Sequence, residues 1–149
     1  MNGTFNFDDG VISLAVNGGQ RIFRFNPTDP AVYEGFMRMT TDAPQELNKL
    51  SIEYEYLDKQ ELEPKERAMK ELEAMNRMDK ILREAFDNTF GPGQADVVFG
   101  AQNVSALGKN GDFVFANALM ALLPYFEKEA NKRTQKVRGI IQDHKPKRK

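Results

Sequence analysis

The sequence has no cysteine, no tryptophan and a single histidine, His144. The absence of cysteine excludes a disulfide scaffold, a thiolate nucleophile and a zinc site with sulfur ligands. His144 stands between Asp143 and Lys145 in a charged segment, and an unsupported histidine of this kind is a poor general base. We therefore expect a protein without enzymatic activity, with no catalytic residue and no cofactor.

Long apolar runs are absent as well. The longest apolar block covers residues 113–126 and includes Asn117, whereas a helix needs about 20 apolar residues to span a bilayer. Residues 1–9 have neither a basic start nor an apolar run, so they lack the pattern of a signal peptide. We expect a soluble, cytosolic protein with no membrane partner.

Acidic residues are abundant in the middle of the chain, without histidine or cysteine beside them. They are Glu53, Glu55, Asp58, Glu61, Glu63, Glu66, Glu71 and Glu73. Paired carboxylates can hold a metal or transfer protons, but a solvated helical face is the favoured interpretation. Residues 108–111, Gly-Lys-Asn-Gly, lack the preceding strand and the spacing of a phosphate-binding loop. We expect no metal site, and we interpret residues 108–111 as a helix-capping turn.

The net charge of -1 conceals an uneven distribution. Residues 128–149 contain nine Lys/Arg and two acidic residues, a charge of +7, which leaves -8 for residues 1–127. Such asymmetry is typical of an interaction tail. Lys and Arg can neutralise nucleic-acid phosphates, but residues 145–149 have no aromatic side chain for base stacking. Nucleic acid is thus the disfavoured partner, and Lys132 and Arg133 are candidates for contact with an acidic protein.

Residues 11–25 predict a β-hairpin. Two short apolar segments flank Asn17-Gly18-Gly19, and Asn-Gly supplies the positive φ angles that a tight hairpin turn requires. Alternation places Phe23 and Phe25 on one face, which we expect to be buried. Residues 5–7 predict a flanking strand.

A helix is predicted from Pro30 to about Glu63. Thr28 or Asp29 can cap it, and proline is favourable in a first helical turn. Residues 42–44, Asp-Ala-Pro, predict a break in this helix because an internal proline removes a hydrogen bond.

Residues 65–90 have the most regular helical pattern in the chain. Asp79 and Arg83 stand four residues apart, which adds modest support, and Gly91-Pro92-Gly93 ends the helix. Short helical turns are predicted at 94–100 and 103–107.

The last helix is predicted to follow Asp112 as its N-cap, to continue through Pro124 and to reach Arg138. Its apolar start, residues 113–126, has two adjacent stripes. One stripe consists of Phe115, Leu119, Leu122 and Phe126, and the other of Val114, Ala118, Ala121 and Tyr125. The segment is either a core helix surrounded by neighbours, or a helix that leaves one stripe for a partner protein. The first stripe is our candidate binding surface.

These elements predict a mainly α chain with a small N-terminal β-hairpin (α+β), arranged as a helical bundle with a long C-terminal helix. We expect a single domain over residues 1–142 and a disordered basic tail over residues 143–149.

Several short motifs follow one another in an order that resembles that of a known protein family. Arg24-Phe25-Asn26-Pro27-Thr28-Asp29 follows the hairpin, and Phe90-Gly91-Pro92-Gly93 ends the central helix. Phe99-Gly100 and Asn103 then precede an apolar helix with a basic end. This layout resembles the tail assembly chaperones of long-tailed (siphovirus-type) bacteriophages, although that family commonly has an acidic residue in place of Pro92.

The resemblance implies a non-enzymatic viral chaperone that is made in the cytoplasm of the infected bacterium and is absent from the finished virion. Its partners would be the tape measure protein, which it holds, and the tail tube protein, which it helps to recruit. Homo-oligomers and a longer, frameshifted form are compatible with this role. The alternative from another class is a small phage DNA-binding or regulatory protein that uses the basic tail.

Overall fold

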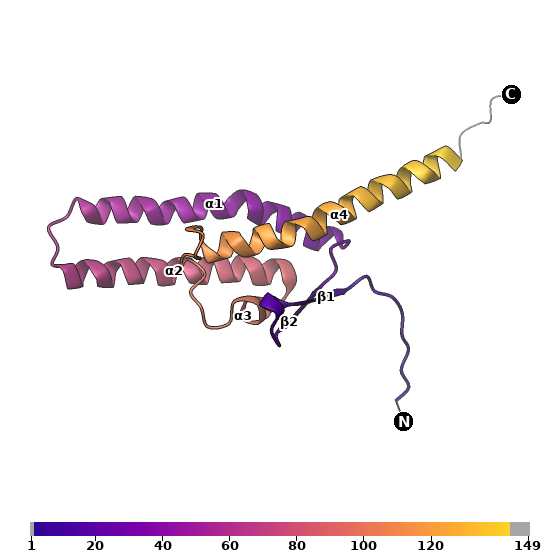
Figure 1. Ribbon diagram of the computed structural model, residues 1–149, viewed down its shortest axis with the longest axis horizontal. Coiled ribbons are helices and arrows are strands. Elements are labelled where there is room, and N and C mark those ends of the chain that lie inside the picture. Colours follow the sequence, from indigo (N-terminus) through magenta and orange to yellow (C-terminus); the bar gives the residue numbers. More distant parts are fainter. Residues whose placement is uncertain (1, 144–149) are drawn as a thin grey trace.

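The computed structural model describes residues 2–143, with the backbone alone for residue 133 and residues 137–143. The elements are β1 (Ile12–Ala15), a 3-10 turn (Val16–Gly18), β2 (Ile22–Phe25), α1 (Pro30–Asp58), α2 (Pro64–Phe90), α3 (Gln94–Phe99) and α4 (Val114–Asp143). Helices α1 and α2 lie side by side, and α4 packs on them before projecting beyond the pair (Figure 1). The mainly helical fold with an N-terminal hairpin and a long C-terminal helix confirms the predicted fold class.

The hairpin forms as its turn sequence predicts. The strands β1 and β2 pair antiparallel, and Asn17 and Gly18 take positive φ angles of 51° and 69°. Phe23 and Phe25 face inward and are 2% and 5% exposed. The hairpin is therefore anchored to the helices through its phenylalanine face, as expected.

The predicted flanking strand at residues 5–7 is wrong. This segment forms no ladder with the hairpin, and the sheet in the described chain consists of β1 and β2. The Asp8 and Asp9 side chains accept hydrogen bonds from the amides of Gly10 and Val11, at 2.9 and 3.0 Å. These local bonds turn the chain just before β1, so residues 5–7 do not continue alongside it.

Helix α1 is continuous through Pro44, so the predicted break is wrong. Ala43 and Leu47 on the same stretch are each 4% exposed, whereas Pro44 lies on the solvent side. Burial of the apolar positions around Pro44 offsets the single backbone hydrogen bond that proline cannot donate. The helix ends at Asp58, before the predicted Glu63.

Asp29 caps α1, since its Oδ1 accepts a hydrogen bond from the Ala31 amide at 2.9 Å. Replacing Asp29 with alanine is expected to lower the free energy of unfolding by about 1 kcal/mol. The control Asp42→Ala removes an exposed carboxylate from the interior of the same helix and should change it by less than about 0.5 kcal/mol. Urea unfolding followed by circular dichroism measures both, and equal losses would contradict the capping role.

Helix α4 does not begin as predicted. It starts at Val114, and the residue before it is Phe113 rather than Asp112. Backbone carbonyls of the preceding turn satisfy its first amides: Val114 N–H donates to Ala106 at 2.8 Å and Phe115 N–H to Val104 at 3.0 Å. The helix continues through Pro124, as predicted, and ends at Asp143, beyond the predicted Arg138. Residues 144–149 of the predicted tail lie outside the described residues.

The centre of the core is a cluster of phenylalanines where the hairpin meets the helices. Phe126 of α4 stacks on Phe36 of α1 with ring centroids 4.1 Å apart, and on Phe25 at 5.5 Å. The ring centroids of Phe23 and of Phe86 on α2 lie 5.7 Å apart. The cluster joins β2, α1, α2 and α4, and it fixes which side of α4 faces inward.

Candidate protein-binding site

The stripe proposed from the sequence as a binding surface belongs to the core. Phe115 and Phe126 are fully buried, and Leu119 and Leu122 are 4% and 7% exposed. Phe115 packs against Phe99 of α3, with ring centroids 5.7 Å apart. The expectation that these four residues contact a partner is therefore wrong, because α1, α2, α3 and the hairpin already cover them.

The second stripe of α4 is the one that remains accessible. Val114 and Ala118 are half-buried, while Ala121 and Tyr125 are exposed. With β1, the hairpin turn and α3 they line a depression of about 460 Å³, which we call the hairpin groove. Of the two interpretations of this helix, the structure thus supports a combination: one stripe packs in the core and its neighbour is left open.

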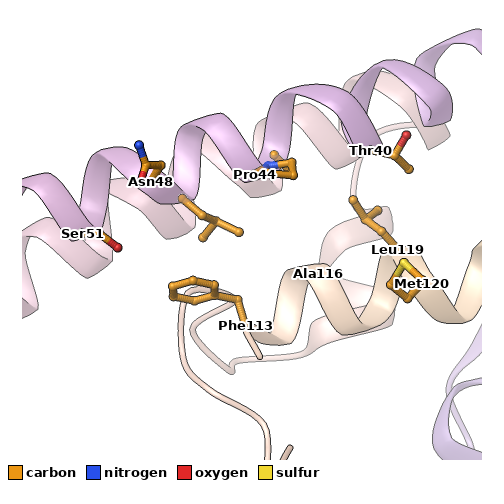
Figure 2. A pocket seen from close by; sticks show the side chains of 10 residues that line it. Thr40, Pro44, Asn48, Ser51, Phe113, Ala116, Leu119 and Met120 are labelled. Carbon is orange, nitrogen blue, oxygen red and sulfur yellow. The ribbon is translucent and has the colours of Figure 1, made fainter. Parts of the chain in front are cut away.

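A second depression lies on the opposite flank of α4, between α4 and α1 (Figure 2). We call it the α1–α4 groove. Its volume is about 360 Å³, and it is lined by Thr40, Ala43, Pro44, Leu47, Asn48, Ser51, Phe113, Ala116, Leu119 and Met120.

None of these ten residues is charged, so the α1–α4 groove is suited to an apolar ligand surface. Ala43, Leu47 and Leu119 form a buried floor, and Met120 at the edge is 65% exposed. Asn48 and Ser51 supply a polar border on the α1 side (Figure 2). An exposed methionine is adaptable because its unbranched side chain can fit partners of different shape.

The basic residues of the predicted site lie apart from both grooves. Lys132 lies on α4, seven residues beyond Tyr125, the last residue of this helix that lines a groove. Its side chain is 59% exposed and forms an ion pair with Glu129 at 3.3 Å. The side chain of Arg133 lies outside the described residues. Lys132 is therefore available for an acidic partner, but the structure does not bring it together with the apolar stripe.

Arg83 organises the segment that leads into α4. Its side chain is only 17% exposed and forms ion pairs with Asp79 at 3.1 Å and with Asp96 at 2.9 Å. It also donates to the carbonyl oxygens of Gly100 and Gln102 at 2.7 and 2.6 Å. A charged donor that serves four acceptors fixes α3 and the following turn against α2.

Asp79 extends this arrangement, since its carboxylate also accepts a hydrogen bond from the Val104 amide at 2.8 Å. Val104 in turn offers its carbonyl to the first turn of α4. Sequence reasoning treated Asp79 and Arg83 only as a helical i,i+4 pair. Their spacing was visible, but the backbone partners come from residues 17 to 25 positions further along the chain, and no local pattern marks them.

Several acidic residues of α1 and α2 lie in ion pairs at the surface. Arg67 pairs with both Asp58 and Glu71, and Arg77 pairs with Glu53 at 2.9 Å. Burial, together with the charges of Glu71 and Glu53, raises the pKa of Tyr54. Within the described residues, no three histidine, aspartate or glutamate side chains are placed to hold a metal ion.

None of the helices, over the part of the chain that was described, combines the length and the apolar character needed to cross a membrane. Comparison of the sequence with known protein families gives no match, and neither curated proteins nor solved structures show a significant similarity to it.

Proposed function

We propose that the protein is a tail assembly chaperone of a long-tailed bacteriophage, and that it binds the tape measure protein without catalysing a reaction. The motif order from Arg24 to Asn103 supports this proposal. The observation that carries it is the uncharged α1–α4 groove, which provides an apolar surface beside a stable helical core. In this role the protein acts in the bacterial cytoplasm and leaves before the virion is complete.

The proposed contact is a helix in a groove. An amphipathic helix of the tape measure protein would place its apolar face along Phe113, Ala116 and Met120, between α4 and α1. Its polar face would meet water and the border formed by Asn48 and Ser51. The groove is open and shallow, so we expect modest affinity per copy and several copies on one long partner. Modest affinity allows tail tube subunits to replace the chaperone.

The basic end of α4 would contribute a second contact. Lys132 is exposed, and Arg133 follows it in sequence. We propose that this end approaches acidic segments of the tape measure or tail tube protein. Such a contact between exposed charges raises the association rate of the two proteins more than it raises their affinity. The contact weakens when salt is added.

Co-expression with a tape measure fragment tests the proposal. We expect the wild-type protein to solubilise and co-purify with the fragment. Met120→Lys should weaken this binding at least about tenfold, because it places an unpaired charge in the apolar contact. Met69→Lys is the matched control, since it makes the same substitution at an exposed methionine of α2 that lies outside both grooves.

Failure of the wild-type protein to hold any tape measure fragment would contradict the proposal. Detection of the protein in finished particles by mass spectrometry would instead indicate a structural subunit. Salt-dependent retention on DNA that is lost when residues 143–149 are deleted would favour the small DNA-binding protein considered as the alternative.

A further inference from the structure

The N-terminal segment presents two large apolar side chains to solvent. Phe5 and Phe7 are 84% and 71% exposed, more than any other large hydrophobic residue described. Their rings lie side by side with centroids 5.8 Å apart. We call residues 2–10 the aromatic arm. It leaves β1 and runs away from the helices (Figure 1).

The direction of the aromatic arm is held at its base. Asn26 donates a side-chain hydrogen bond to the carbonyl of Asp9 at 2.9 Å. Gly10 has a positive φ of 75°, and a Cβ atom there would lie 2.8 Å from the Asn26 side-chain nitrogen. The arm's exit from β1 is thus fixed by close contact with the Asn26 side chain. Beyond this base the rings of Phe5 and Phe7 are exposed, so they are accessible to another molecule.

The hairpin groove has the chemistry to receive the aromatic arm. Its lining is mixed: Phe99, Val114 and Ala118 supply apolar surface, Asn117 and Gln102 supply polar groups, and the exposed Arg21 lies at its rim. The arm has the complementary composition, because two acidic residues, at positions 8 and 9, follow its phenylalanines. Apolar rings can enter the groove while the carboxylates approach Arg21.

We propose that the aromatic arm of one copy docks Phe5 and Phe7 in the hairpin groove of a second copy, and that the exchange is reciprocal. Arm and groove both adjoin β1, so a two-fold axis near β1 satisfies both contacts at once. Phenylalanine has a large apolar surface, so two rings in each of two grooves supply the hydrophobic part of this contact.

The oligomeric state of the full-length protein tests this inference. Light scattering after size-exclusion chromatography should give a dimer for the wild type. The double variant Phe5→Ser/Phe7→Ser should be a monomer with unchanged thermal unfolding of the monomer fold, since both side chains lie outside the core. Asn6→Ser is the matched control. Asn6 lies between the two phenylalanines, and alternation along an extended chain places its side chain on the opposite face. The Asn6→Ser variant should therefore remain a dimer.

A mixing experiment makes the test specific to arm exchange. Ala118→Arg fills the hairpin groove and should also give a monomer. Mixing it with the double arm variant should restore a mixed dimer, because one intact arm then meets one intact groove. A wild-type monomer at every concentration, a dimer that survives loss of both phenylalanines, or a failure of the two folded variants to combine would each overturn the inference. No phage component enters this experiment, so its result is independent of the proposed chaperone role.

Discussion

Replacing Phe126 with alanine is expected to lower the free energy of unfolding by about 3–5 kcal/mol. Phe126 is fully buried and contacts rings from three other elements, the closest being Phe36 at 4.1 Å. Removing the ring leaves a cavity that the hairpin and both long helices border, and none of them can close it without moving the others. Urea unfolding followed by circular dichroism measures the loss.

Met120→Ala provides the comparison for this prediction, because Met120 lies on the same helix and is 65% exposed. Its removal should change the free energy of unfolding by less than about 1 kcal/mol. Similar losses for the two variants would mean that Phe126 is not a core residue. The contrast also separates the buried stripe of α4 from its groove-lining positions: changes in the buried stripe should affect folding, and changes along the grooves should affect binding.

Replacing Arg83 with methionine is expected to lower the free energy of unfolding by about 2–3 kcal/mol. Methionine preserves much of the aliphatic packing but removes donors to Asp79, Asp96 and the carbonyls of Gly100 and Gln102. These acceptors are then left without their charged donor in a partly buried position. Chemical unfolding measures this loss. The turn after α3 carries the carbonyls that accept hydrogen bonds from the first amides of α4, so we also expect faster hydrogen exchange at the Val114 and Phe115 amides of the variant.

Arg38→Met is the control for the loss of an arginine. Arg38 also forms an i,i+4 ion pair, with Glu34 at 2.7 Å, but its side chain is 65% exposed. Such surface pairs contribute little, so the expected change is below about 0.5 kcal/mol. An Arg83 variant as stable as the Arg38 variant would show that the bonds to the backbone are not what holds α3 in place.

Arg83→Met also bears on function, because Arg83 helps to hold the start of α4. The first turns of α4 border both the α1–α4 groove and the hairpin groove. A change that loosens this start should therefore impair binding in either groove without touching a ligand. Binding assays on Arg83→Met should be compared with its stability before any direct contact is assigned to that residue.

Local signals in the sequence were sufficient for several elements. Asn17-Gly18 specified the hairpin turn through its positive φ angles, and Asp29 specified the start of α1 through its side-chain cap. Gly91-Pro92-Gly93 specified the end of α2 at Phe90. Each of these signals acts within a few residues, so its outcome depends little on the rest of the chain.

Long-range packing decided the features that sequence reasoning missed. Pro44 remained inside α1 because its neighbours Ala43 and Leu47 are buried against other elements. Asp112 lost the capping role because the carbonyls of Val104 and Ala106 reached the first amides of α4. In both cases a contact distant in sequence outweighed a local preference.

The sequence by itself determined that α4 would be apolar over more than one face, that its end would be basic and that a β-hairpin would precede a helical bundle. Only the tertiary structure decided which stripe of α4 is covered. Helical spacing makes the stripes of Phe115 and Val114 equivalent in pattern, because periodicity records which residues share a face but not what lies opposite them. The phenylalanine cluster lies on the side of Phe115 and Phe126, so that stripe faces inward, and the stripe of Val114 lines the hairpin groove.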